Sequence, residues 1–212
     1  MESLDEQLEN AFNELEISPE QRGSILTFIN PLKIKDQETW EHSMRIGLKN
    51  IVVARFTHID DPKAWFYVGT LHDVGKALTD PKSLKKKNGF NEKDKKELDK
   101  HVIDGYRLLR GTHEFTANAI LWHHYFSGGY PSKRAMPKSN IDFSEATELK
   151  AMYLGRFTGL IDFYDAANNR ENDKFSPGKP RLPTPEEAKE LLLEHNPDQR
   201  HFIKELYDAG IF

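Results

Sequence analysis

Helical periodicity runs along nearly the whole chain and limits the possible folds more than any other feature. Apolar residues recur three or four positions apart, as in Leu4, Leu8 and Phe12, while no alternating pattern continues for more than a few residues. We therefore predict an all-α protein, a helical bundle with long loops. The expected helices cover about residues 3–15, 18–29, 36–57, 64–72, 91–110, 114–125, 145–169, 184–194 and 198–208.

Start and stop signals set several of these boundaries. Ser18 followed by Pro19 and Gln21 is a helix start, and we expect that helix to end before Asn30-Pro31, because the residue before a proline disfavours the helical conformation. Residues 126–144 and 170–183 are rich in glycine and proline and are expected to be long loops, which often carry function. We divide the chain into an N-terminal helical extension, residues 1–35, and a main domain, residues 36–212.

The composition excludes several classes of site. None of the 212 residues is cysteine, so disulfides, thiolate zinc sites, a cysteine nucleophile and iron–sulfur clusters are excluded. The longest apolar runs are too short to span a bilayer, and the N-terminus is acidic, unlike a signal peptide. We expect a cytoplasmic protein with no membrane partner. The net charge of −4 argues against binding a nucleic-acid polymer, although residues 76–100 contain nine lysines and five acidic residues.

Five of the nine histidines, with two aspartates, form an ordered series along different predicted helices. Helical bundles build metal sites from ligands on facing helices, and seven imidazole and carboxylate groups exceed what one ion needs. The count therefore favours two metal ions, although a single histidine in a helix is usually structural. The series is His42, His72, Asp73, His101, His123, His124 and Asp162. The remaining histidines, His58, His113, His195 and His201, fit no such pattern and are expected to be surface or structural residues.

The phrase His72-Asp73-Val74-Gly75-Lys76 resembles the signature of the HD superfamily of metal-dependent phosphohydrolases. The order of the other phrases is similar to the HD-GYP branch, known for hydrolysing cyclic di-GMP, and the resemblance covers about residues 38–195. Those phrases are His42-Ser43-Met44-Arg45-Ile46, Pro81-Lys82-Ser83-Leu84, His101-Val102-Ile103-Asp104-Gly105, His123-His124, Gly129-Tyr130-Pro131 and Asp162-Phe163-Tyr164-Asp165-Ala166.

This resemblance implies an HD-domain helical bundle and a phosphodiesterase that hydrolyses a cyclic dinucleotide with a metal-activated hydroxide at a binuclear centre. It assigns one ion to His42, His72, Asp73 and Asp162, and the other to Asp73, His101, His123 and His124. Iron or manganese is favoured, and nickel or zinc also suits these ligands. Glu38 lies one helical turn before His42 and is a candidate for a third ion; the alternative is a solvated glutamate near a helix start.

The resemblance also suggests catalytic and substrate-binding residues. Asp73 and Lys76 are the catalytic candidates, Lys76 as a contact to phosphate or to the leaving oxygen, with a surface lysine at a helix end as the alternative. The loop at Gly129 and Tyr130 is expected to approach the nucleotide, to bind a partner protein, or to form an ordinary turn. The candidate substrate contacts are Lys76, Gly129, Tyr130, Arg134, Arg170 and Lys174.

Departures from the branch leave the substrate open. Tyr125 replaces the glutamate that usually follows the paired histidines, and residues 168–174 replace an Arg-Pro-Tyr stretch that contacts phosphate. The alternatives are therefore hydrolysis of cyclic GMP-AMP or a mononucleotide, a di-iron oxygenase, and a non-catalytic nucleotide-binding module. The N-terminal helices are compatible with a homodimer.

Overall fold

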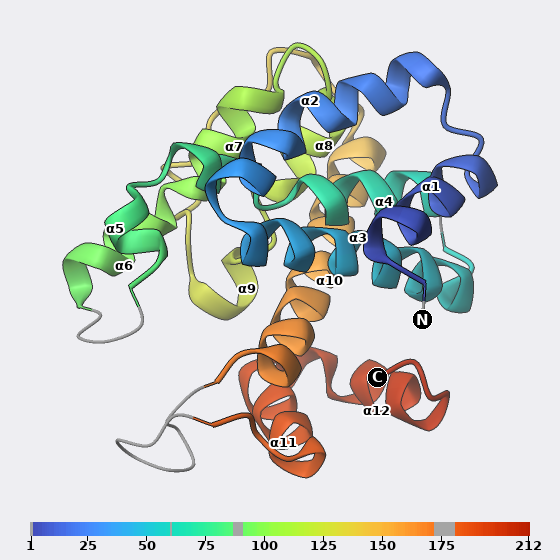
Figure 1. The fold of residues 1–212 in the computed structure, drawn as a ribbon, viewed down its shortest axis with the longest axis vertical. Helices are drawn as coiled ribbons and strands as arrows, with labels where there is room; N and C mark the ends of the chain where they lie inside the picture. Colours follow the sequence, from blue (N-terminus) through green and yellow to red (C-terminus); the bar gives the residue numbers. More distant parts are fainter. Residues whose placement is uncertain (1, 60, 87–90, 172–180) are drawn as a thin grey trace.

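The computed structural model describes residues 2–59, 61–86, 91–171 and 181–212. Within these ranges the regular structure is helical and contains no β-strand, which confirms the predicted all-α helical bundle (Figure 1). No helix in the described ranges is long and apolar enough to cross a bilayer.

The helices follow one another in the order α1 (Leu4–Glu14), α2 (Pro19–Lys35), α3 (Gln37–Thr57), α4 (Pro62–Leu71), η1 (Val74–Leu78), α5 (Pro81–Leu84), α6 (Glu92–Asp99), α7 (His101–Leu109), α8 (Glu114–Ile120), α9 (Tyr125–Gly128), α10 (Glu145–Asn169), α11 (Pro185–His195), η2 (Pro197–Gln199) and α12 (Arg200–Asp208). The elements η1 and η2 are short 3₁₀-helices, and the others are α-helices.

The centre of the bundle is formed by α3, α4, α8 and α10, which pack against one another. In Figure 1, α10 runs from this body towards α11 and α12, while α5 and α6 project on the opposite side from α1. The core continues into the N-terminal helices, because the fully buried Phe12 of α1 packs edge-to-face on Phe66 of α4 with ring centres 5.8 Å apart. The N-terminal extension therefore shares its apolar core with the rest of the chain.

The expectation that the second helix ends before Asn30-Pro31 is wrong. Helix α2 continues through Pro31 to Lys35. An internal proline removes one backbone hydrogen bond and disfavours the helix, but Ile25, Ile29 and Leu32 lie on one helical face and are fully buried. Burying these three side chains outweighs the cost of the proline, each being worth about 1.5–3 kcal/mol when fully buried.

The expected helix at 91–110 is divided at Lys100 into α6 and α7. The imidazole Nδ1 of His101 lies 2.6 Å from the carbonyl oxygen of Leu98, within hydrogen-bond distance. In an uninterrupted helix that carbonyl would accept the amide of residue 102. The expected helix at 114–125 likewise stops at Ile120, before the paired histidines. Both breaks fall where a histidine side chain bonds the main chain.

Two glycines let α10 approach the segment that carries the paired histidines. A Cβ atom on Gly159 would lie 1.8 Å from the carbonyl oxygen of His123, and one on Gly155 would lie 2.1 Å from that of Ala119. Any other residue at these positions would push the two backbones apart. The close approach brings Asp162, one turn beyond Gly159, to the histidine cluster.

Candidate metal centre

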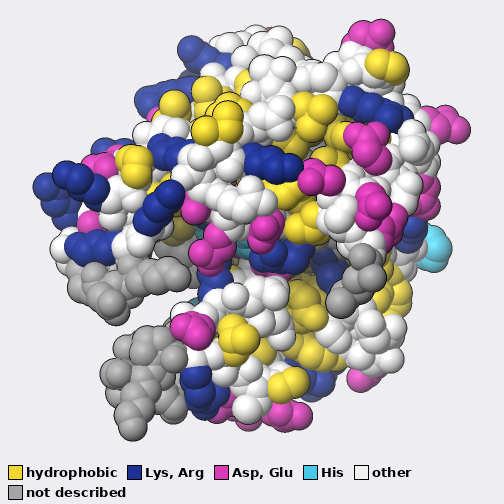
Figure 2. Space-filling view, in the orientation of Figure 1, with side chains coloured by type: hydrophobic (Ala, Val, Ile, Leu, Met, Phe, Trp, Pro, Cys, Tyr) yellow, Lys and Arg dark blue, Asp and Glu magenta, His cyan; other side chains and the backbone are white. Residues whose placement is uncertain are grey.

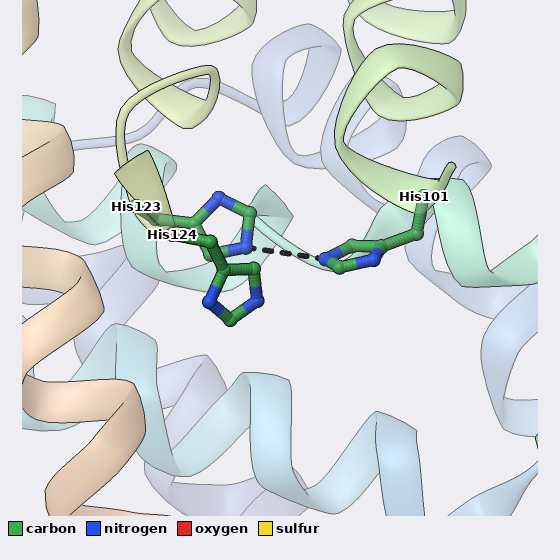
Figure 3. Close-up of side chains that lie close together, drawn as sticks. All are labelled: His101, His123 and His124. Carbon is green, nitrogen blue, oxygen red and sulfur yellow. Dashed lines mark hydrogen bonds between the residues drawn. The ribbon is translucent and has the colours of Figure 1, made fainter. Parts of the chain in front are cut away.

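Candidate ligand atoms gather in two groups among the described residues. The first group is His101, His123 and His124, whose imidazoles converge in Figure 3, and the second is His42, His72 and Asp162. Within each group the ligand atoms all lie within 4.8 Å of one another.

Asp73 lies between the two groups. Its Oδ1 is 3.2 Å from Nε2 of His101, and its Oδ2 is 3.4 Å from Nε2 of His72 and 3.8 Å from Nε2 of His42. The structure thus brings all seven residues of the sequence series together, with one carboxylate facing both groups. Which ion each residue binds stays a prediction.

The orientation of three of the imidazoles comes from helix ends. The Nδ1 atoms of His72, His101 and His123 lie 2.7, 2.6 and 2.5 Å from the carbonyl oxygens of the residues three positions earlier, Gly69, Leu98 and Ile120. Each carbonyl belongs to the last turn of a helix, where it has no partner within that helix. The Nδ1 proton is therefore donated to the main chain, and the unprotonated Nε2 is directed into the site, as metal binding requires.

A partly buried ion pair between Arg45 and Asp165 orients the fourth imidazole. Nδ1 of His42 lies 2.7 Å from Oδ2 of Asp165, whose carboxylate also accepts two hydrogen bonds of 2.8 Å from Arg45. Burial alone would raise the pKa of Asp165, but the bonds from Arg45 and His42 outweigh it and lower that pKa to about 2. The sequence series does not contain Arg45 or Asp165. The signal for them is weak: each follows a candidate ligand by three positions, and the two residues have charges of opposite sign to each other.

Several buried acceptor atoms in the site face one another without a hydrogen bond. Nε2 of His42 lies 2.9 Å from Oδ1 of Asp162, and it forms no hydrogen bond there. Nε2 of His72 and Oδ1 of Asp73 are also buried without a hydrogen-bond partner in the described structure. Buried polar atoms are costly when they have no partner, and a cation between two lone pairs relieves that cost. The nitrogen and oxygen donor set therefore fits divalent metal ions.

The charge state of the site also suits metal binding. Burial lowers the pKa of His101 to about 3 and that of His124 to about 4, and it lowers that of His123 far below its usual range. Burial opposes ionisation of the two aspartates, but Lys76 and His72 hold the pKa of Asp73 well below its ordinary value, and His42 does so for Asp162.

His72 is the exception. Burial is the largest influence and lowers its pKa, but Asp73 and Asp162 together outweigh burial, and the net pKa is raised. At neutral pH three imidazoles are consequently neutral and both carboxylates are charged, the forms that bind metals.

Two of the predicted catalytic and substrate-binding residues lie beside this centre. The ammonium of Lys76, on η1, contacts Oδ2 of Asp73, and its side chain is mostly buried. The ring of Tyr130 packs on that of His124, with centres 4.8 Å apart and planes inclined at 31°, and its hydroxyl lies beside Asp99. Gly129 precedes it with a positive φ of 69°.

The other described candidates belong to neither group of ligand atoms. Glu38 is exposed in the first turn of α3 and belongs to neither group of ligand atoms. Arg134 is exposed in the loop between α9 and α10, and Arg170 is the residue that follows the end of α10. Lys174 lies outside the described residues.

The histidines left out of the series have structural contacts or lie at the surface. Nε2 of His113 is 2.8 Å from the hydroxyl oxygen of Ser24, and the ring of His195 stacks on that of Phe163. His58 and His201 are exposed.

A helical bundle in which buried histidines and aspartates converge from several helix ends is suited to binding divalent metal ions. The sequence matches the HD domain over residues 38–189, which includes every candidate ligand of the two groups and Asp73. The chain therefore belongs to the HD domain family. This membership supports metal-dependent phosphohydrolase activity. A comparison with curated proteins gave no match.

Proposed function

We propose that this protein is a metal-dependent phosphodiesterase that hydrolyses a cyclic dinucleotide, with cyclic di-GMP as the first candidate, at a centre of two divalent ions. The observation that carries the proposal is the position of Asp73, whose two oxygens face the two groups of ligand atoms. A shared carboxylate is the usual bridge between two ions in such a site.

The ligand sets suit two ions better than one. Each group offers three ligand atoms besides Asp73, which leaves coordination positions for water and substrate. When bound, the ions would supply an activated water as nucleophile and offset negative charge on the phosphate. Imidazole and carboxylate ligands favour iron or manganese, and nickel or zinc remains compatible. Glu38 is exposed and lies in neither group of ligand atoms, so we do not include a third ion in the proposal.

The protein's own groups have separate tasks in this proposal. Lys76 can donate a hydrogen bond to a phosphate oxygen, because its ammonium is directed into the site at Asp73. Burial, with Asp99 and Asp162 nearby, raises the pKa of Tyr130, so its phenol stays protonated and can donate. Its ring limits the access of water to His124 and offers a face for a base.

Charge on the surface supports an anionic substrate. Lys and Arg side chains gather over the α5 and α6 end of the face shown in Figure 2. In the sequence, the segment 76–100, to which α5 and α6 belong, has nine lysines against five acidic residues. A basic rim raises the local concentration of a nucleotide near the site.

A second candidate is hydrolysis of another nucleotide, cyclic GMP-AMP or a mononucleotide, at the same centre. It is favoured by the residues after Asp162: the segment has no Arg-Pro-Tyr stretch, and Arg170 lies beyond the end of α10. The proposed Gly129-Tyr130-Pro131 loop then serves a different base or a partner protein.

The test is metal analysis of anaerobically purified wild type, Asp73→Ala and Asp142→Ala, followed by hydrolysis of a nucleotide panel. Asp142 is exposed and serves as the matched control. We expect wild type and Asp142→Ala to contain two ions and to hydrolyse a cyclic dinucleotide, while Asp73→Ala loses both metal and activity. Full activity in Asp73→Ala would refute the site. Turnover of a mononucleotide alone would favour the second candidate.

A further inference from the structure

Lys35 connects the N-terminal helices to the segment that carries Lys76. It is the last residue of α2 and precedes the region of the family match, which begins at residue 38. Its ammonium donates hydrogen bonds to the carbonyl oxygen of Ala77, over 2.7 Å, and to that of Thr79. Both acceptors lie at the C-terminal end of η1, two helical turns or less from the candidate catalytic aspartate.

The short helix η1 needs support from outside. It has five residues and begins directly after Asp73, which is its N-cap residue. Short 3₁₀-helices have poor hydrogen-bond geometry, and the last carbonyls of any helix lack partners within it. A lysine at this end both accommodates these carbonyls and interacts favourably with the helix dipole.

Helix α7 also packs closely against η1. A Cβ on Gly75 would lie 1.9 Å from the carbonyl oxygen of His101 and 2.5 Å from the amide nitrogen of Gly105. The backbone of η1 therefore touches the helix of one candidate ligand and is also bonded by Lys35. Together these contacts restrict the segment that carries Lys76.

The corner that follows Lys35 is also ordered. Asp36 ends α2 and starts α3, and its Oδ2 accepts a hydrogen bond of 2.6 Å from Thr39. His42 lies one turn further along α3. The same corner thus connects η1 to the first candidate ligand.

We propose that Lys35 is a positioning residue: it holds η1 in place and so keeps the ammonium of Lys76 at Asp73. This inference rests on the proposed function for its catalytic consequence, but the contact itself can be measured without any substrate. It gives the N-terminal extension a direct role at the site, as the part of the protein that fixes the segment after the histidine–aspartate doublet.

The first experiment is amide hydrogen exchange of the full-length protein with the substitution Lys35→Met. The amides of Lys76 and Thr79 are hydrogen-bonded to the carbonyls of Asp73 and Lys76 and report on η1. We expect their exchange to accelerate by about tenfold or more, the effect of losing a hydrogen bond to a charged donor. Lys63→Met is the control, because Lys63 also donates to a backbone carbonyl, that of Glu16, at the other end of α4 from His72.

The second experiment measures hydrolysis in two backgrounds. If Lys35 acts through Lys76, Lys35→Met lowers kcat in the wild type and has little further effect in Lys76→Ala, while Lys35→Arg restores protection and activity. Unchanged exchange at η1, or an equal loss of kcat in both backgrounds, would overturn the proposal. Accelerated exchange in a protein that hydrolyses no nucleotide would support the contact and count against the proposed function.

Discussion

Replacing Gly159 by alanine tests the close approach that brings α10 to the histidine cluster. The new Cβ would lie 1.8 Å from the carbonyl oxygen of His123, whereas Cβ contacts below 3.0 Å essentially do not occur. The two backbones must therefore separate locally by about 1.2 Å, the difference between these distances. The obstructing atom belongs to the main chain, so no side-chain rotation can relieve the contact.

The magnitude follows from two opposing effects. Overpacking of this kind costs about 1–3 kcal/mol, and alanine regains up to about 1 kcal/mol relative to glycine in a helix. We expect a net loss of about 1–2 kcal/mol, and hence a decrease in Tm of about 2–8 °C for a chain of this size. Asp162 moves with α10, away from His124, and a displacement of about 1 Å in a site can cost about 100-fold in activity.

The matched control is Gly23→Ala. Gly23 lies in α2 with open space around its Cβ position, so the same substitution should raise stability by about 0.5–1 kcal/mol. Calorimetry and a manganese titration against a chelating dye measure both variants. The reasoning is refuted if Gly159→Ala keeps the Tm and metal affinity of the wild type, or if the two variants shift Tm in the same direction.

Three further predictions concern protons and metal. Asp165→Asn should raise the Kd for metal by about 10–100-fold, because it loosens His42, and a metal titration checks this. The folded pKa of Asp165 is about 2, so the wild type loses stability as the pH falls from about 4 to 2, and acid unfolding should show that the variant lacks this loss. The pKa values of His101 and His124 are about 3 and about 4 in the folded protein, so below about pH 6.5 the unfolded chain binds more protons than the folded one. The metal-free protein should therefore become less stable to urea as the pH falls from about 6.5 to about 4, and an unchanged urea midpoint would contradict this. Chelation of the metal should lower Tm by about 5–10 °C relative to protein in metal at 100 times its Kd, and a Tm indifferent to chelator would exclude binding to the folded state.

The sequence predicts the all-α fold and most helices because apolar spacing and capping residues are local signals. It fails where packing in the core or a side-chain bond to the main chain decides the structure. Helix α2 passes Pro31 because burial of Leu32 in the core offsets the cost of the proline, and the helix expected at 91–110 breaks where the side chain of His101 bonds the carbonyl of Leu98. Neither effect is visible in the apolar spacing or in the capping residues.

The candidate site divides in the same way. The seven-residue series can be read from residue type and order, and the structure brings its members together. The support around it cannot be read in this way, because Arg45 and Asp165 are 120 positions apart and Lys35 bonds a carbonyl 42 positions away. Gly155 and Gly159 are four positions apart in one predicted helix, a spacing typical of close helix packing.

The use of main-chain carbonyls to orient three imidazoles has a consequence for mutational tolerance. A carbonyl is present whatever the side chain, so the half-exposed Leu98 can be replaced by many residues while the partner of His101 persists. The orientation of His42 depends instead on one carboxylate side chain, Asp165, which a single substitution removes. The orientation of His72, His101 and His123 therefore tolerates substitutions of the residues that they bond more readily than the orientation of His42 tolerates a substitution of Asp165.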